Sequence, residues 1–95
     1  MGETYDVIVA QSASRDIRRL APALQRTVLA ALTALGTESR FGKPLAGTLR
    51  GIWSLRRGDY RVLYRIDDPA RRVEVARVWH RRDAYRRSSA EPHSA

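Results

Sequence analysis

The chain has 95 residues, of which 43% are hydrophobic and 29% charged, a balance that fits one small domain and excludes a two-domain enzyme. It has no cysteine and only two histidines, so we expect no disulfide, no metal centre and no bound cofactor. Eighteen basic residues against ten acidic ones give a net charge of +8, and every basic residue except Lys43 is an arginine.

The positive charge is concentrated in the second half of the chain. Residues 1–48 carry a net +2, residues 49–87 carry +7 and residues 88–95 carry −1. Arginine binds phosphate through two parallel hydrogen bonds and stacks on nucleobases, although a GC-rich genome alone also favours arginine codons. The asymmetry indicates a polyanionic partner, most often a nucleic acid. Because no stretch approaches the roughly 20 apolar residues of a membrane span, and none resembles a secretion leader, we expect a cytoplasmic protein without membrane contact.

The first half of the chain predicts a strand and two helices. Residues 4–10 are rich in β-branched side chains and form the expected first strand. Ser12 is expected to cap a first helix over 12–20, with Asp16 in its first turn. A proline at the start and a glycine at the end favour a second helix over 22–36.

The second half predicts a connector followed by three strands. Residues 36–51 contain four glycines and no regular hydrophobic periodicity, so we expect a connector without regular structure, with Leu45 and Leu49 against the core. Three strand-like runs follow, at 52–56, 60–67 and 73–79. The short links between them are of hairpin length.

Alternation within these runs predicts which side chains are buried. Apolar and polar side chains alternate over the middle run, which places Tyr60 and Tyr64 on the core face and leaves the other face exposed to solvent. The last run is apolar on both faces, as is typical of a central strand, and we expect Trp79 in the core. A turn of helix is expected from His80 onward.

The predicted fold class is therefore α+β. A strand, two helices and a three-stranded antiparallel meander form a four-stranded sheet with both helices on one face, and the first strand lies beside the last. A short helical turn ends the domain, which spans 1–87, and the polar tail at 88–95 is expected to be disordered.

Basic and aromatic residues interleave in two segments, 56–65 and 79–87. This pattern supplies phosphate clamps and stacking platforms together, as RNA-binding surfaces do, although an arginine on the wet face of a strand is commonly only a solvated charge. His80 and Tyr85 can exchange protons, whereas arginine effectively cannot. A histidine at a strand end is also commonly structural, and Tyr85 could instead anchor the last turn to the sheet.

The segments 52–66 and 80–85, with the connector 43–51 and the strand–helix–helix opening, resemble the RelE/ParE superfamily of toxins from bacterial toxin–antitoxin pairs. The resemblance rests on Leu-Arg-Gly, then aromatic-x-Leu-Arg, then Gly-x-Tyr-Arg-x-x-Tyr, and it covers about residues 5–87. RelE-like members cut mRNA in the ribosomal decoding site without a metal. The resemblance therefore implies a type II toxin that acts as a metal-independent endoribonuclease, or mRNA interferase.

The resemblance also implies the site residues. By position, Arg61, Arg81 and Tyr85 match the catalytic arginines and the C-terminal tyrosine of the family, and His80 is similar to the histidine that related branches use as acid or base. The arginines expected to bind RNA are Arg50, Arg56, Arg57, Arg65, Arg82 and Arg86.

One departure from the family lies on the second strand. Where well-known RelE members have two lysines, this chain has Ile52 and Ser54. The nearby candidates to replace them are Arg50, Arg56 and His80.

The resemblance implies as partners a cognate RelB-like antitoxin with an acidic helical segment, the ribosome and mRNA. The main alternative is a ParE-like toxin that binds DNA gyrase and performs no chemistry, and a third is an inert basic domain. The set Arg61, Arg81 and Tyr85 favours RNA cleavage, because a gyrase poison does not need it.

Overall fold

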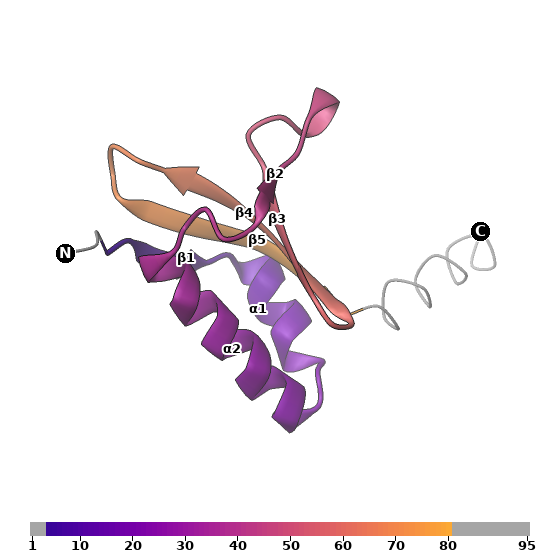
Figure 1. The fold of residues 1–95 in the computed structure, drawn as a ribbon. Helices are drawn as coiled ribbons and strands as arrows, with labels where there is room; N and C mark the ends of the chain where they lie inside the picture. The colour runs from indigo at the N-terminus through magenta and orange to yellow at the C-terminus, as the bar shows by residue number, and fades with distance from the viewer. Residues whose placement is uncertain (1–3, 81–95) are drawn as a thin grey trace.

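The computed structural model describes residues 4–80, which form a five-stranded sheet with two helices on one face (Figure 1). The elements in chain order are β1 (Asp6–Val9), α1 (Gln11–Arg18), α2 (Pro22–Thr37), β2 (Lys43–Pro44), the short 3-10 helix η1 (Gly47–Leu49), β3 (Trp53–Arg57), β4 (Tyr60–Asp67) and β5 (Arg72–His80). The strand order is β1-β5-β4-β3-β2, with β1 parallel to β5 and the other pairs antiparallel. The predicted α+β class, the antiparallel meander and the position of the first strand beside the last are confirmed.

The connector contributes a fifth strand that the sequence did not predict. Lys43 and Pro44 pair with the start of β3 at the edge of the sheet, where a residue without an N–H is tolerated. The Leu45 N–H donates to the Ile52 carbonyl oxygen at 2.8 Å and closes the loop that carries η1. This loop projects away from the sheet in Figure 1, so Leu49 is 49% exposed and not against the core as expected.

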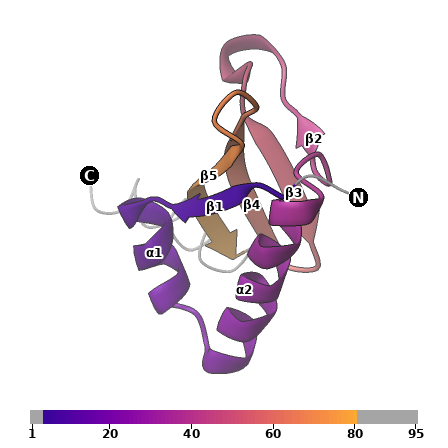
Figure 2. The ribbon, with the colours of Figure 1, turned by 90° about the vertical axis from the view of Figure 1, so that its left-hand side faces the viewer.

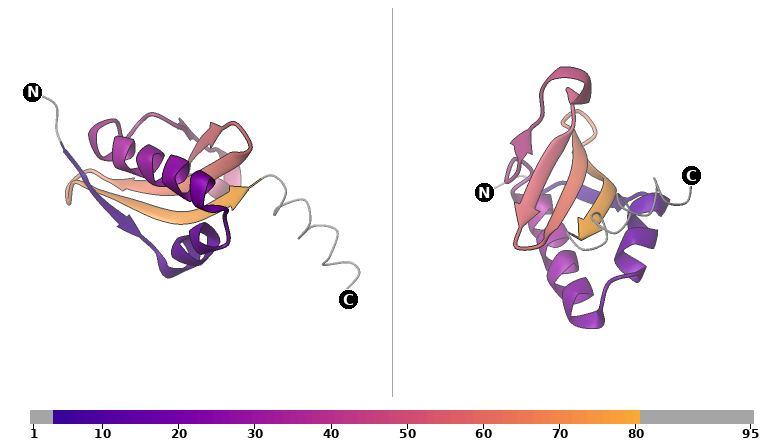
Figure 3. Two further views of the ribbon diagram at one scale, coloured as in Figure 1. Left: turned by 90° about the horizontal axis from the view of Figure 1, so that it is seen from below. Right: turned by 90° about the vertical axis from the view of Figure 1, so that its right-hand side faces the viewer.

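The core lies between the helices and one face of the sheet, as Figures 2 and 3 show. Val28, Leu32 and Leu35 recur at helical spacing on α2 and are buried. Full burial of each such side chain contributes about 1.5–3 kcal/mol. The α2 helix continues to Thr37, so Gly36 lies inside it and not at its end as expected. Glycine suits this position because a Cβ there would meet the Tyr5 carbonyl oxygen at 3.0 Å.

Helix α1 covers the part of β5 that β1 leaves unpaired. β1 pairs with β5 only as far as Val75. Beyond that residue, the Ser12 hydroxyl donates to the Ala76 carbonyl oxygen at 2.7 Å, and the Asp16 carboxylate accepts the Val78 N–H at 2.9 Å. Ser12 is not the cap and Asp16 is not in the first turn, because the helix begins at Gln11 with Ala10 as its cap residue. Both side chains instead bind the β5 backbone.

The pairing of β5 with β4 shifts by one residue at Ala76, which has no opposite residue on β4. Such a bulge reverses the alternation of faces beyond it. Val75 and Val78 consequently both face the helices and are buried. Trp79, expected in the core, lies on the outer face of the sheet instead, and His80 lies on the helix side.

The segment between α2 and β2 is tied to the sheet by Tyr64. Its hydroxyl donates to the Ser39 carbonyl oxygen at 2.8 Å and accepts the Gly42 N–H at 3.0 Å. A Cβ on Gly42 would lie 2.6 Å from the Ser54 carbonyl oxygen, so the close approach of this segment to β3 requires glycine.

A polar cluster joins the same segment to the β4–β5 turn. Arg40 Nη2 lies 2.7 Å from Asp68 Oδ2, and the Tyr5 hydroxyl donates to Asp68 Oδ1 at 2.6 Å. The Arg40 guanidinium holds the pKa of Asp68 below its usual value, and the Tyr5 hydrogen bond lowers that pKa further.

No helix within residues 4–80 is long and apolar enough to cross a membrane. His80, which was expected to begin a helical turn, is instead the last residue of β5. The rest of the expected turn, the domain limit at 87 and the tail at 88–95 lie outside the described residues.

Candidate functional site

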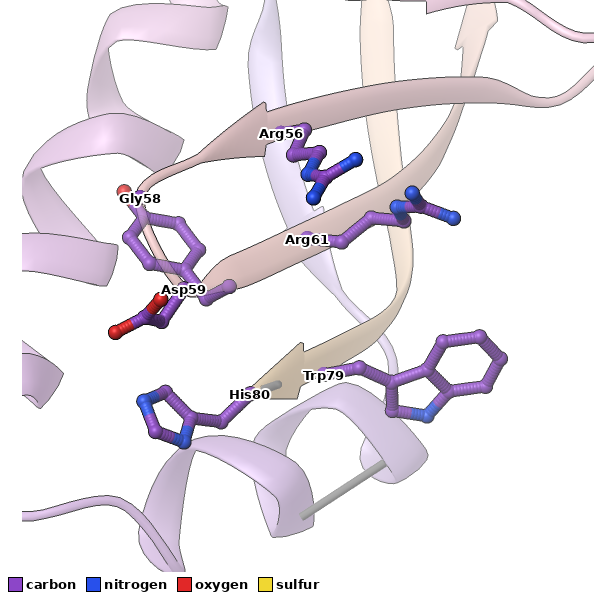
Figure 4. A pocket seen from close by; sticks show the side chains of 7 residues that line it. Arg56, Gly58, Asp59, Arg61, Trp79 and His80 are labelled. Atoms are coloured by element: carbon purple, nitrogen blue, oxygen red, sulfur yellow. The ribbon is translucent and has the colours of Figure 1, made fainter. Parts of the chain in front are cut away.

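A hollow of about 300 Å³ lies where the β3–β4 hairpin meets the end of β5 (Figure 4). Its lining residues come from these three strands and the hairpin turn, and they are Arg56, Gly58, Asp59, Tyr60, Arg61, Trp79 and His80. Gly58 has a positive φ of 54°, which the tight two-residue turn needs and which glycine adopts without strain.

Two arginines and a tryptophan form one row across the outer face. In the strand register Arg56 is opposite Arg61, and Arg61 is opposite Trp79. Directly opposite residues share a face, and Figure 4 shows the three side chains leaving the sheet on the same side. Both arginines are exposed, and within residues 4–80 neither has an acidic partner. Like charges directly opposite each other destabilise a sheet, and an anion bound between the two guanidinium groups would relieve this repulsion. The arrangement therefore favours an anionic ligand.

The opposite face carries a second row, in which Arg57 is opposite Tyr60 and Tyr60 is opposite His80. Tyr60 is 4% exposed, and its hydroxyl has no hydrogen-bond partner among the described residues. Burial raises the pKa of Tyr60, and the charge of Arg57 offsets this only in part, so the phenol stays protonated at neutral pH. His80 borders the hollow from this side, away from the side chain of Arg61 (Figure 4).

Comparison with known proteins identifies the family. A family model described as ParE toxin of type II toxin-antitoxin system, parDE, matches residues 7–85. The chain belongs to this family. It is therefore a toxin of a type II toxin–antitoxin system, and the resemblance to the RelE/ParE superfamily is confirmed.

Individual relatives point to the RelE branch. Toxin RelE of Mycobacterium tuberculosis is 41% identical over 92 residues, which cover 93% of this chain and 93% of that protein. Toxin RelG of the same organism is 46% identical over 85 residues, covering 87% and 98%. The toxin–antitoxin complex RelBE2 of M. tuberculosis matches the structure with a TM-score of 0.79 and 41% identity, over 83% of this chain and 93% of that chain. Isolated E. coli RelE shares the fold alone, with a TM-score of 0.70, 17% identity and coverage of 96% and 99%.

The other predicted site residues of the toxin are distributed as follows. Arg65 lies on the same outer face as Arg61 but nearer the other end of β4, and its Nη1 would be 3.7 Å from a Cβ on Gly51. Arg50 is exposed in the projecting loop beside Gly51. Arg57 points away from this face, with its guanidinium carbon 4.5 Å from the centre of the Phe41 ring. Four more predicted residues, Arg81, Arg82, Tyr85 and Arg86, lie outside the described residues.

The structure adds two residues that the sequence analysis did not assign to the site. Lys43 is opposite Ser54 in the register, which places it on the outer face of the toxin next to the row that begins at Arg56. The sequence feature that could have pointed to Lys43 is that it is the only lysine in a chain whose other basic residues are all arginine. Trp79 was placed in the core, and only the bulge at Ala76 brings it to the site.

Proposed function

We propose that the toxin is a metal-independent endoribonuclease that cleaves mRNA on the ribosome. The observation that carries the proposal is the exposed Arg56–Arg61 pair, two cations opposite each other beside the hollow, neither of which forms an ion pair within residues 4–80. Relatives named RelE support the same branch. The 2′-hydroxyl that this reaction needs makes RNA the substrate and excludes DNA.

In the proposed reaction, the 2′-hydroxyl oxygen attacks the adjacent phosphorus and the bond from phosphorus to the 5′-oxygen breaks. One proton leaves the 2′-hydroxyl and another reaches the departing 5′-oxygen, so the products are a 2′,3′-cyclic phosphate and a 5′-hydroxyl. Negative charge grows on the non-bridging oxygens in the transition state. Arg61 and Arg56 stabilise that charge, because guanidinium groups remain protonated and form paired hydrogen bonds with phosphate.

The proton transfers are assigned to His80 and Tyr85, and a further cation to Arg81. His80 lines the hollow from the helix side of the sheet, opposite to the face that carries the Arg61 side chain, so its part in the assignment rests on its match to the family pattern. Imidazole is the side chain best suited to give and take protons near neutral pH. The parts of Tyr85 and Arg81 rest on their match to the family pattern.

The test is cleavage of a defined message on programmed ribosomes, with the new 3′ ends mapped. Arg61→Ala is expected to lower the cleavage rate about 100-fold or more, the loss typical of removing a group that stabilises a developing oxyanion. Arg26→Ala is the matched control, because Arg26 is an exposed arginine on α2 that does not line the hollow, and its loss should leave the rate unchanged. A rate that falls equally in both variants, or in neither, contradicts the site.

A second candidate is poisoning of DNA gyrase without chemistry, which the ParE description of the matching family favours. Inhibition of gyrase supercoiling by wild-type protein, combined with intact message on ribosomes, would establish it in place of RNA cleavage.

The proposed partner is a cognate antitoxin with an acidic helical segment. The relative in the RelBE2 structure is described as a toxin–antitoxin complex, and the net charge of +8 on this chain suits an acidic peptide. Because such contacts are screened by ions, the affinity for this antitoxin should fall as salt rises.

A further inference from the structure

The outer face of the sheet holds an aromatic ring beside the arginine pair. Trp79 is partly exposed, borders the hollow and is directly opposite Arg61 on the neighbouring strand. Neighbouring strands lie about 4.8 Å apart, so the indole begins one strand away from Arg61 and two strands away from Arg56. Figure 4 shows the ring projecting on the same side as both guanidinium groups.

The Trp79 ring is positioned by Arg77, which is in turn bound to Asp16 on helix α1. The guanidinium carbon of Arg77 lies 5.2 Å from the centre of the Trp79 ring. Arg77 is itself fixed, because its Nε and Nη2 donate to the Asp16 carboxylate at 2.9 and 3.2 Å. Asp16 is 6% exposed, so this anchor is nearly buried. A cation on one side of the indole and a buried anchor behind it make a rigid aromatic surface.

The indole is a poor choice for a purely structural position. Trp79 Nε1 is buried and has no hydrogen-bond acceptor among residues 4–80. An unpaired buried donor destabilises the folded state, and phenylalanine would fill the position without one. Nothing in the core requires the ring, since Trp79 lies on the face away from the helices.

We propose that Trp79 is a base-stacking platform for single-stranded RNA, on which a nucleobase next to the phosphate held by Arg56 and Arg61 stacks. This inference rests on the proposed RNA cleavage and adds a determinant of substrate preference. Stacking on an aromatic side chain accepts any base, but it grows with the area of the base. The toxin therefore cleaves faster where a purine occupies the stacked position than where a pyrimidine does.

The experiment measures kcat/KM on programmed ribosomes for messages that differ only in a purine or a pyrimidine beside the cleaved linkage. Trp79→Leu keeps apolar bulk but removes the ring, and it should lower kcat/KM on the purine message about tenfold and abolish the purine preference. Trp79→Phe keeps a ring and should retain the preference. Trp53→Phe is the matched control, because Trp53 packs against Tyr64 on the other face, and it should leave both quantities unchanged.

Each result decides between the two proposals. Wild-type protein that cleaves no message overturns both the RNA-cleaving function and the platform. Wild-type protein that cleaves, together with a Trp79→Leu variant that has unchanged kcat/KM or unchanged purine preference, overturns the platform and leaves RNA cleavage standing. Thermal unfolding of each variant is followed by circular dichroism, and the purine-to-pyrimidine ratio, which compares two messages with one enzyme preparation, does not depend on the fraction folded.

Discussion

The buried carboxylate of Asp16 offers the sharpest test of how α1 is attached to the sheet. It accepts hydrogen bonds from Arg77 Nε and Nη2 and from the Val78 N–H, at 2.9, 3.2 and 2.9 Å. The pKa of Arg77 is raised by its hydrogen bond to Asp16, as expected for a guanidinium paired with an anion. Asp16→Asn keeps the size of the side chain but removes its charge and replaces one acceptor oxygen by a donor.

The expected loss in the free energy of unfolding depends on how deeply Asp16 and Arg77 are each buried. Breaking a fully buried ion pair from one side costs about 3–5 kcal/mol. The Arg77 side chain is 33% exposed and can regain water, whereas Asp16 is 6% exposed and the Val78 N–H is buried. We therefore expect Asp16→Asn to lower the free energy of unfolding by about 2–3 kcal/mol, below the fully buried range.

The assay is urea denaturation followed by circular dichroism, with Glu74→Gln as the matched control. Glu74 lies 3.7 Å from Arg72, and both side chains are 45% exposed. An exposed pair contributes at most about 0.2–1 kcal/mol, so the control should cost little. If Asp16→Asn costs no more than Glu74→Gln, the carboxylate does not anchor the helix and the reasoning fails.

Three further predictions concern the segment around α2 and β2. Tyr64→Phe removes a hydroxyl that donates one hydrogen bond and accepts another, and it should lower the free energy of unfolding by about 1–2 kcal/mol in urea denaturation. An unchanged midpoint would show that these two hydrogen bonds do not stabilise the fold. Gly42→Ala brings a Cβ to 2.6 Å from a backbone oxygen of β3, and should cost about 2 kcal/mol or more in the same assay, a prediction that fails if the variant is as stable as wild type. Because Arg40 lowers the folded-state pKa of Asp68, the contribution of this pair is present above the usual value of 3.8 and is lost as the pH falls through the lower folded-state pKa. The stabilities of wild type and Arg40→Ala, measured by thermal unfolding from neutral to strongly acidic pH, should therefore converge in acid, and a constant gap would contradict the assignment.

Local patterns predicted the parts of the fold that local forces determine. The alternation over β4 correctly placed Tyr60 and Tyr64 in the core, and short links correctly indicated two hairpins. The two helices follow from apolar side chains at helical spacing and from proline at the start of α2. The pairing of Arg56 with Arg61 was not predicted, because the sequence analysis ended the first strand at residue 56, whereas β3 continues to Arg57 and leaves a two-residue turn.

The failures depend on tertiary structure. An unbulged β5 would turn Trp79 toward the helices, and the one extra residue at Ala76 reverses the faces of both Trp79 and His80. No composition or spacing rule distinguishes a bulge from an apolar central strand in this run. Asp16 has the position of a surface carboxylate on a short helix, and only its approach to the free edge of β5 explains its burial.

The cover that α1 gives to β5 also affects how copies of the toxin meet. A strand edge with free N–H and carbonyl groups can add a strand from another molecule, which is a common start of aggregation. Here Ser12 and Asp16 bind two of those groups, the Ala76 carbonyl oxygen and the Val78 N–H, which are then not available to a further strand. Loss of the Asp16 carboxylate therefore frees the Val78 N–H to pair with a strand of another molecule. We expect such a variant to aggregate when the protein is concentrated, in addition to being less stable.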